Sequence, residues 1–208
     1  GTIQGPPTGF ASIDKQWLQT YTDEAILDKS PSESLYGYLY RCWKNNLNAI
    51  AINFEGKKIT RYEFLSNVCK LEEELKQRGV VKGDIISLAP ANIPESIYSI
   101  YAINKIGAKV SVVDPRSNEY VLLEDINCSF PKPNLFIGVE TVKNIFSKIL
   151  SKLSIKDYIF ISPMQSAPEN KMKKIYSIIR KLNGNGIYSK RNNYSKIIKK
   201  YDLKKYDI

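Results

Sequence analysis

Residues 59–116 decide the fold, and they read ITRYEFLSNVCKLEEELKQRGVVKGDIISLAPANIPESIYSIYAINKIGAKVSVVDPR. Thr60 and Glu63 have the spacing of a capping box, in which each side chain accepts a hydrogen bond from the backbone N–H of the other residue. A helix is therefore predicted to begin here and to end at Gly79, because a left-handed residue suits a helix C-terminus. Its apolar residues recur at helical spacing, namely Phe64, Leu65, Val68, Leu71 and Leu75.

The second half of this stretch predicts strand, helix and strand. A turn at residues 80–84 leads into a short apolar strand at 85–89. Pro94 stands just inside the next helix, where its missing N–H costs nothing, and Gly107 ends that helix. A second strand is predicted at 109–113. The apolar residues expected along this helix are Ile97, Ile100, Tyr101, Ile103 and Ile106.

Short apolar strands next to helices with one apolar face favour an α/β fold, a mostly parallel sheet with helices on both faces. The remaining elements agree with this class. A hairpin is predicted at 49–59, further strands at 134–137 and 157–162, and further helices at 34–46, 117–126, 140–153 and 171–182, with Ser117 as an N-cap. The predicted division of the chain is an aromatic leader at 1–33, the α/β subdomain at 34–186, and a Lys/Tyr-rich segment at 187–208. We expect the leader to bury Phe10 and Trp17 on the subdomain.

Charge is unevenly distributed along the 208 residues. Residues 1–170 hold 19 basic and 19 acidic side chains, so the net charge of +10 comes entirely from residues 171–208. Lysines interleaved with tyrosines can bind single-stranded nucleic acid. A solvated lysine-rich surface is the alternative that we favour, so nucleic acid is not expected as a partner.

Composition excludes several kinds of chemistry. The chain has no histidine, which removes Ser-His-Asp and Cys-His mechanisms. Cys42, Cys69 and Cys128 form no CxxC pair, and we expect them to be reduced, buried thiols of a cytoplasmic protein. No signal peptide and no apolar run long enough to span a membrane is evident. No carboxylates stand at metal-ligand spacing, so no metal site is assigned.

Several stretches, in order, resemble the N-terminal part of the AMP-forming acyl-CoA synthetases. This family belongs to the adenylate-forming superfamily, with firefly luciferase and nonribosomal-peptide adenylation domains. Residues 59–65 are similar to its "T-Y-x-E-L" motif, 79–84 to "G-V-x-K-G-D", and 90–95 to "P-N-x-P-E". Residues 103–108 and 112–116 are similar to "x-x-K-x-G-A", a strand and "D/N-P", and residues 9–18 look like the leader of some bacterial members. The resemblance covers roughly residues 9–162.

The resemblance implies an incomplete adenylate-forming ligase fold and a two-step reaction for a parent protein. A carboxylate would attack the α-phosphate of ATP, and a thiol, that of CoA, would then displace AMP. ATP, Mg²⁺ and CoA are thus implied for the parent, with a carboxylic acid as substrate and the remainder of the ligase chain as partner. The family's phosphate clamp, a Ser/Thr/Gly-rich loop ending in Lys-Gly, is missing, and residues 184–186 only approach it. We expect an N-terminal fragment that is inactive alone.

The candidate site residues follow from the predicted elements and from the family resemblance. No catalytic residue is assigned, and Arg116 and Lys143 are the candidates for binding the CoA nucleotide, because they stand near strand or helix ends. The motif residues are expected to be structural: Thr60, Tyr62, Glu63, Gly79, Gly83, Asp84, Asn92, Pro94, Glu95, Gly107, Asp114 and Pro115. Two alternatives stay open. One is an adenylation domain that loads a carrier protein, and the other is a non-catalytic binding module with a basic tail.

Overall fold

The computed structural model describes residues 7–27, 32–155, 157–182 and 192–201. The chain divides into two compact units, Gly1–Ser32 and Glu33–Ile208, and each is described by itself. No helix within these ranges is long and apolar enough to cross a lipid bilayer. The predicted breaker at 183–186 and most of the Lys/Tyr-rich segment lie outside the described residues.

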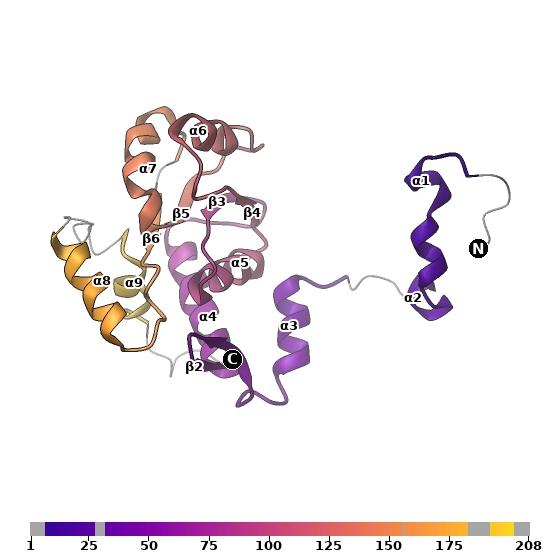
Figure 1. The fold of residues 1–208 in the computed structure, drawn as a ribbon, viewed down its shortest axis with the longest axis horizontal. Helices are drawn as coiled ribbons and strands as arrows, with labels where there is room; N and C mark the ends of the chain where they lie inside the picture. The colour runs from indigo at the N-terminus through magenta and orange to yellow at the C-terminus, as the bar shows by residue number, and fades with distance from the viewer. Residues whose placement is uncertain (1–6, 28–31, 156, 183–191, 202–208) are drawn as a thin grey trace. The chain divides into compact units, whose positions relative to one another are not determined.

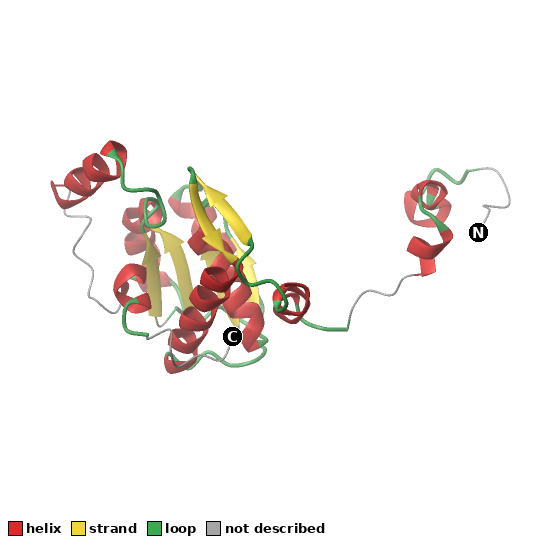
Figure 2. Cartoon of the chain, turned by 90° about the horizontal axis from the view of Figure 1, so that it is seen from below, coloured by secondary structure: helices red, strands yellow, loops and turns green. Residues whose placement is uncertain are grey.

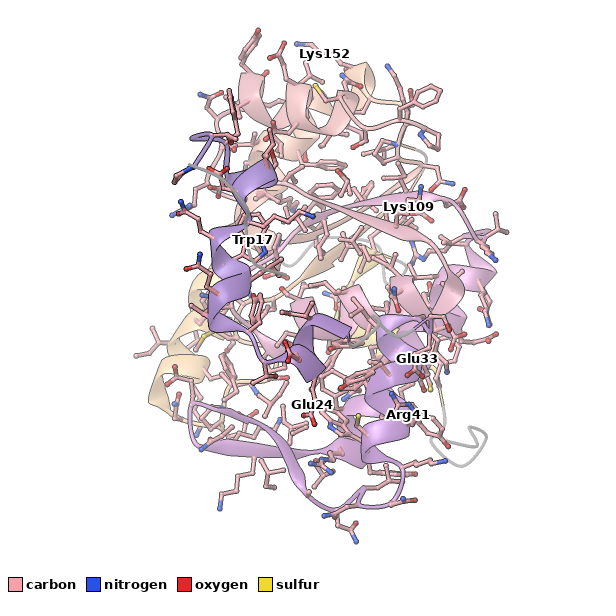
Figure 3. The ribbon with its side chains drawn as sticks, turned by 90° about the vertical axis from the view of Figure 1, so that its right-hand side faces the viewer. Trp17, Glu24, Glu33, Arg41, Lys109 and Lys152 are labelled. Carbon is pink, nitrogen blue, oxygen red and sulfur yellow. The ribbon has the colours of Figure 1, made fainter. Side chains whose placement is uncertain are left out.

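The first unit contains three short helices, α1 (Ala11–Asp14), the 3-10 helix η1 (Gln16–Thr20) and α2 (Asp23–Leu27). Asp14 organises its start, because the Asp14 carboxylate accepts hydrogen bonds from the Thr8 amide and hydroxyl and from the Gly9 amide, at 2.7–3.0 Å. Phe10 and Trp17, the latter labelled in Figure 3, are 66% and 46% exposed, so this unit does not bury them itself. Their burial on the second unit stays a prediction.

The second unit is built on a parallel sheet of four strands. These strands are β3 (Ile85–Ala89), β4 (Lys109–Val112), β5 (Leu135–Val139) and β6 (Asp157–Ile161), in the order β4-β3-β5-β6. The pairing places Ser87 of β3 beside Ser111 of β4 on one side and Phe136 of β5 on the other. β3 and β5 are buried along their whole length, whereas the edge strand β4 is partly exposed.

Helices cover both faces of this sheet (Figures 1 and 2). In Figure 1, α4 (Arg61–Gln77) and α5 (Pro94–Ile106) lie below it and pack on each other, while α6 (Glu119–Asn127) and α7 (Lys143–Ile149) lie above. α3 (Leu35–Trp43) packs on α5, and the antiparallel hairpin of β1 (Ile50–Phe54) and β2 (Lys57–Thr60) packs beside α4. α8 (Lys171–Leu182) and α9 (Tyr194–Ile198) complete the unit. The predicted fold class is confirmed.

The capping signals of the sequence are present in α4 and α5. The Glu63 amide donates to the Thr60 hydroxyl at 3.1 Å, and the Thr60 amide donates to the Glu63 carboxylate at 2.8 Å. Gly79 follows α4 with a φ of 85°, and Gly107 ends α5 with the same φ, in the left-handed region that glycine adopts without strain. All five predicted apolar residues of α4 are buried.

Two helices, α5 and α6, differ from the prediction in detail. On α5, Ile103 is buried but Ile97 is exposed, and Tyr98 and Ala102 face the core instead. The helix lies between sheet, α3 and α4, so its buried surface is broader than one apolar stripe. The cap of α6 is Asn118, whose side chain accepts from the Val121 amide, and not Ser117 as predicted.

The helix predicted at 140–153 is three shorter pieces. The 3-10 turns η2 (Glu140–Val142) and η3 (Leu150–Lys152) flank α7, and Val142, Phe146 and Ile149 are buried. The burial of the cysteines differs more from the prediction. All three are free thiols, but only Cys69 is buried, and Cys42 and Cys128 are exposed.

The described part of the Lys/Tyr-rich segment, 192–201, packs into the second unit. Tyr194 and Ile197 of α9 are buried, and the Asn192 side-chain amide donates to the Tyr158 carbonyl of β6 at 2.6 Å. Asn193 adds a parallel bridge to Phe160. The apolar side chains of these residues therefore pack with the α/β subdomain, whereas the predicted boundary at 187 lies outside the described residues and stays a prediction.

Candidate functional site

The strand order creates a switch point at the carboxyl edge of the sheet. From β3 the chain crosses to β4 on one side, and it then returns to β5 on the other side of β3. The connections that leave β3 and β5 therefore diverge onto opposite faces. Open α/β sheets bind ligands in the crevice formed at such a point.

A cavity of about 640 Å³ occupies this position, and we call it the switch-point crevice. Its walls come from the ends of three strands. The lining residues are 90–92 after β3, 112–116 at the end of β4, and Val139 and Thr141 at the end of β5. This volume lies within the range of about 300–1,000 Å³ that is typical of small-molecule sites.

Asp114 and Arg116 form the charged rim of the switch-point crevice. The Arg116 guanidinium donates to both oxygens of Asp114, at 2.7 and 3.0 Å, and the Arg116 amide donates to the same carboxylate at 2.8 Å. These hydrogen bonds hold the pKa of Asp114 at about 2. The Arg116 side chain is 88% exposed, so most of the guanidinium faces solvent and is open to a further anion.

Asn92 and Pro115 also line the crevice, whereas Pro94 and Glu95 turn away from it into the fold. Pro94 is buried at the start of α5. The Glu95 carboxylate is buried, it accepts a hydrogen bond from the Ser166 hydroxyl, and its second oxygen has no hydrogen-bond partner. Burial raises the pKa of Glu95, and the hydrogen bond from Ser166 opposes this only in part.

Gly83, Asp84 and Gly107 lie at the opposite, amino edge of the sheet. The Gly83 amide donates to the Gly107 carbonyl at 3.0 Å, which joins the turns that precede β3 and β4. The Asp84 carboxylate accepts from the Val81 amide at 2.9 Å and from the Asn134 side chain at 3.3 Å. These residues therefore organise loops at the amino edge and do not line the switch-point crevice.

Lys143 and Tyr62 lie outside the crevice. Lys143 is half-buried at the first position of α7, two residues after Thr141, and does not belong to the described lining. Tyr62 is on α4, and its amide donates to the Leu47 carbonyl at 2.9 Å. Of the two candidates for nucleotide binding, the structure thus puts Arg116 on the crevice and Lys143 just beyond it.

The crevice offers groups that bind but none that reacts. Its polar side chains are a guanidinium, a carboxylate paired with it, an amide and a hydroxyl. Within the described ranges, no three His, Cys, Asp or Glu side chains gather where they could hold a metal ion. The arrangement suits the docking of an anionic ligand at the rim of an apolar wall.

The sequence had not identified Pro90, Val112, Val139 or Thr141 as site residues. Each stands at the carboxyl end of a strand, so the switch-point rule would have found them once the strand order was known. That order depends on sheet pairing between distant segments, which no local motif encodes.

These features define an α/β protein with an open parallel sheet and a ligand-sized crevice at its switch point. Residues 39–132 match the family model described as AMP-binding enzyme. This stretch of the chain is similar to the family, and the chain spans only part of the length of the relatives it matches.

Two curated relatives and two solved structures illustrate the similarity. The acetyl-coenzyme A synthetase of Sinorhizobium medicae is 38% identical over 131 residues, which are 54% of this chain and 20% of the relative. That of Dictyostelium discoideum is 39% identical over 84 residues, 38% of this chain and 12% of the relative. This chain therefore spans a fifth or less of these relatives.

The solved structures show the same fold. A luciferase-like enzyme from the mealworm Zophobas morio superposes with a TM-score of 0.64 at 16% identity, covering 86% of this chain and 38% of that one. A long-chain-fatty-acid-CoA ligase from Archaeoglobus fulgidus gives 0.62 at 15% identity, covering 85% and 32%. The predicted resemblance to AMP-forming acyl-CoA synthetases is confirmed by these relatives, and the predicted fold by the solved structures.

Proposed function

We propose that the whole protein of which this chain forms part is an ATP-dependent, AMP-forming carboxylic acid:CoA ligase. A substrate carboxylate would attack the α-phosphate of ATP and release pyrophosphate, and the CoA thiol would then displace AMP from the acyl-adenylate. The observation that carries this proposal is the identity of 38% to an acetyl-coenzyme A synthetase over 131 residues, combined with the family match at 39–132.

In that reaction, this chain would contribute a binding site, the switch-point crevice. Arg116 presents a guanidinium at its rim, and arginine binds phosphate oxygens bidentately with charge-assisted hydrogen bonds. Lys143 begins the helix that follows Thr141, close in sequence to the crevice wall. We propose that both contact the phosphates of the CoA nucleotide.

The chain alone is proposed to be inactive. Its sequence holds no Ser/Thr/Gly-rich loop ending in Lys-Gly to grip the ATP phosphates, and the described residues offer no metal-binding cluster for Mg²⁺. The groups that line the crevice are suited to binding an anion.

A second candidate function keeps the adenylation step and changes the acceptor. The thiol would then belong to the phosphopantetheine arm of a carrier protein, as in adenylation domains. The identity to acetyl-coenzyme A synthetases favours free CoA over a carrier. A basic binding module is disfavoured by the packing of 192–201, since Tyr194 is buried and cannot stack on a base. A cytoplasmic location stays a prediction.

The test measures pyrophosphate release by the full-length protein with ATP, Mg²⁺ and acids of increasing length, beginning with acetate. AMP formation that depends on CoA, but not on a phosphopantetheinylated carrier protein, would support the proposal. The 208-residue chain is assayed in parallel and should release no pyrophosphate above the protein-free blank. A full-length protein that never forms acyl-adenylate would refute the proposed function.

Variants of the full-length protein test the two binding residues. Arg116→Ala and Lys143→Ala should each raise KM for CoA about tenfold, because each removes a charged hydrogen-bond partner of a phosphate, with KM for ATP unchanged. Lys148→Ala is the matched control, an exposed lysine on α7 that is 3.8 Å from Glu119. An equal change in all three variants would contradict the assignment.

A further inference from the structure

A second cavity, here named the hairpin cavity, lies on a different part of the same unit. It has a volume of about 210 Å³, and its walls come from β2, from one stripe of α4, from Tyr98 of α5 and from Ser166 after β6. It shares no lining residue with the switch-point crevice. Its volume is below the range of about 300–1,000 Å³ for drug-sized ligands, so its occupant would be a small molecule or ion.

Ser66 gives this cavity an unusual feature. The residue is only 2% exposed, it lines the cavity from α4, and its hydroxyl oxygen has no hydrogen-bond partner. Buried hydroxyls are nearly always satisfied by protein or by another molecule. The Ser66 hydroxyl is therefore a donor that the described protein groups leave for a ligand.

The charge of the lining favours an anion. Lys57 and Lys70 contribute two ammonium groups, against the single carboxylate of Glu63. That carboxylate is already engaged, because Glu63 accepts from the Thr60 amide at 2.8 Å and from the Thr60 hydroxyl at 3.0 Å. A ligand in the cavity would thus meet the Lys57 ammonium group beside the Ser66 hydroxyl.

The rest of the wall is held in place by contacts behind it. The Ser166 hydroxyl donates to the buried Glu95 carboxylate, and the Tyr98 side chain is only 2% exposed. Burial raises the pKa of Glu95. The Ser166 hydroxyl and the Tyr98 ring therefore form a buried part of the cavity wall.

We propose that the hairpin cavity binds a small oxyanion, a carboxylate or phosphate, which accepts a hydrogen bond from the Ser66 hydroxyl and is neutralised by Lys57. This site is separate from ATP and CoA binding, and its existence does not depend on the proposed ligase function. Hydroxyl donors and an ammonium group are the usual partners of such anions.

The test uses the 208-residue chain and follows backbone amide shifts by NMR during titration with sodium phosphate and, separately, sodium acetate. Sodium chloride at equal ionic strength is the control. Saturable shifts of residues 57–67 with phosphate or acetate, and not with chloride, are expected. The anion with the lower dissociation constant identifies the source of the oxyanion.

Three variants make the test specific. Ser66→Ala and Lys57→Gln should each weaken binding about tenfold, the loss expected when a hydrogen bond to a charged group is removed. Lys58→Gln, the exposed neighbour on β2 that is not part of the lining, should change it less than twofold. The melting temperature of Ser66→Ala should not fall, since its hydroxyl has no partner in the protein.

Two outcomes would overturn the proposal. One is the absence of saturation with phosphate and with acetate, or equal shifts with chloride, which would mean only general screening. The other is an equal loss of affinity in Lys57→Gln and Lys58→Gln with no effect of Ser66→Ala, which would place the anion on the surface of the hairpin and not in the cavity.

Discussion

Replacement of Arg78 by methionine tests how the terminal segment is joined to the sheet. Arg78 follows α4, and its side chain is only 3% exposed. Its guanidinium lies 2.7 Å from the Glu74 carboxylate on α4 and 2.8 Å from the Asp157 carboxylate on β6. Lys200 and Tyr201 reach Glu74 at 3.0 and 2.8 Å. Arg78 thus links α4 to β6, and Glu74, its partner on α4, is joined in turn by the residues after α9.

The expected loss of stability is about 3 kcal/mol. Removal of one partner from a buried ion pair costs about 3–5 kcal/mol, because it leaves an uncompensated buried charge. In Arg78→Met, Glu74 keeps Lys200 and Tyr201, and Asp157 keeps the side chain of Asn192 at 3.3 Å. These remaining partners put the estimate at the lower end of that range.

Urea unfolding followed by circular dichroism measures this loss. With a denaturant slope of about 2 kcal/mol/M, the midpoint of Arg78→Met should fall by about 1.5 M with no change in slope. Arg41→Met is the matched control. Arg41 pairs with Glu33 at 2.6 Å (both are labelled in Figure 3), but its side chain is 56% exposed, so the midpoint should shift little.

The reasoning would be refuted by equal midpoints for the two variants. Such a result would mean that water reaches Arg78 in the folded protein, or that 192–201 does not hold the position described. A loss confined to the Arg78 variant, together with easier proteolysis after Asn192, would support the buried link.

Three further perturbations test other parts of the fold. Burial raises the pKa of Glu74, but hydrogen bonds from Tyr201, Lys200 and Arg78 outweigh it and hold the pKa below its ordinary value of 4.5. Its stabilising contribution is therefore complete above pH 4.5 and lost as the pH falls through the lower folded value, and urea midpoints should drop less on acidification in Glu74→Gln. Thr60→Ala removes the capping box and should cost about 1 kcal/mol in the same assay, whereas no loss would contradict the cap. Gly138→Ala would place a methyl group 2.5 Å from the Phe136 ring and should lower the unfolding free energy by about 1–3 kcal/mol. Gly56→Ala is the control, because its turn is open and only backbone strain acts there.

Local signals were sufficient for most of the fold. The capping box at Thr60, the proline at the start of α5 and the left-handed glycines after α4 and α5 mark boundaries that the structure reproduces closely. These features succeed because they satisfy hydrogen bonds or backbone angles within a few residues. The α/β class followed from the same punctuation, since short apolar strands between helices leave few other arrangements.

The faces that those helices bury were less predictable. Ile97 is exposed on α5 while Tyr98 is buried, because α5 is covered by three neighbours and not by the sheet alone. The same holds for the terminal segment. Its lysines indicated a solvated tail, yet Tyr194 and Ile197 fill a gap beside β6 and α4 that becomes visible only when those elements are packed.

For the candidate site, the sequence determined that Asp114, Pro115 and Arg116 follow a strand and that the chain resembles an acid-activating ligase. Only the tertiary structure decided that these residues share a crevice with Asn92 and Thr141, because the strand order β4-β3-β5-β6 is set by pairing between segments far apart in the chain. The partnerless hydroxyl of Ser66 is likewise a property of packing, since any serine on a helix has the same local pattern whether or not a cavity faces it.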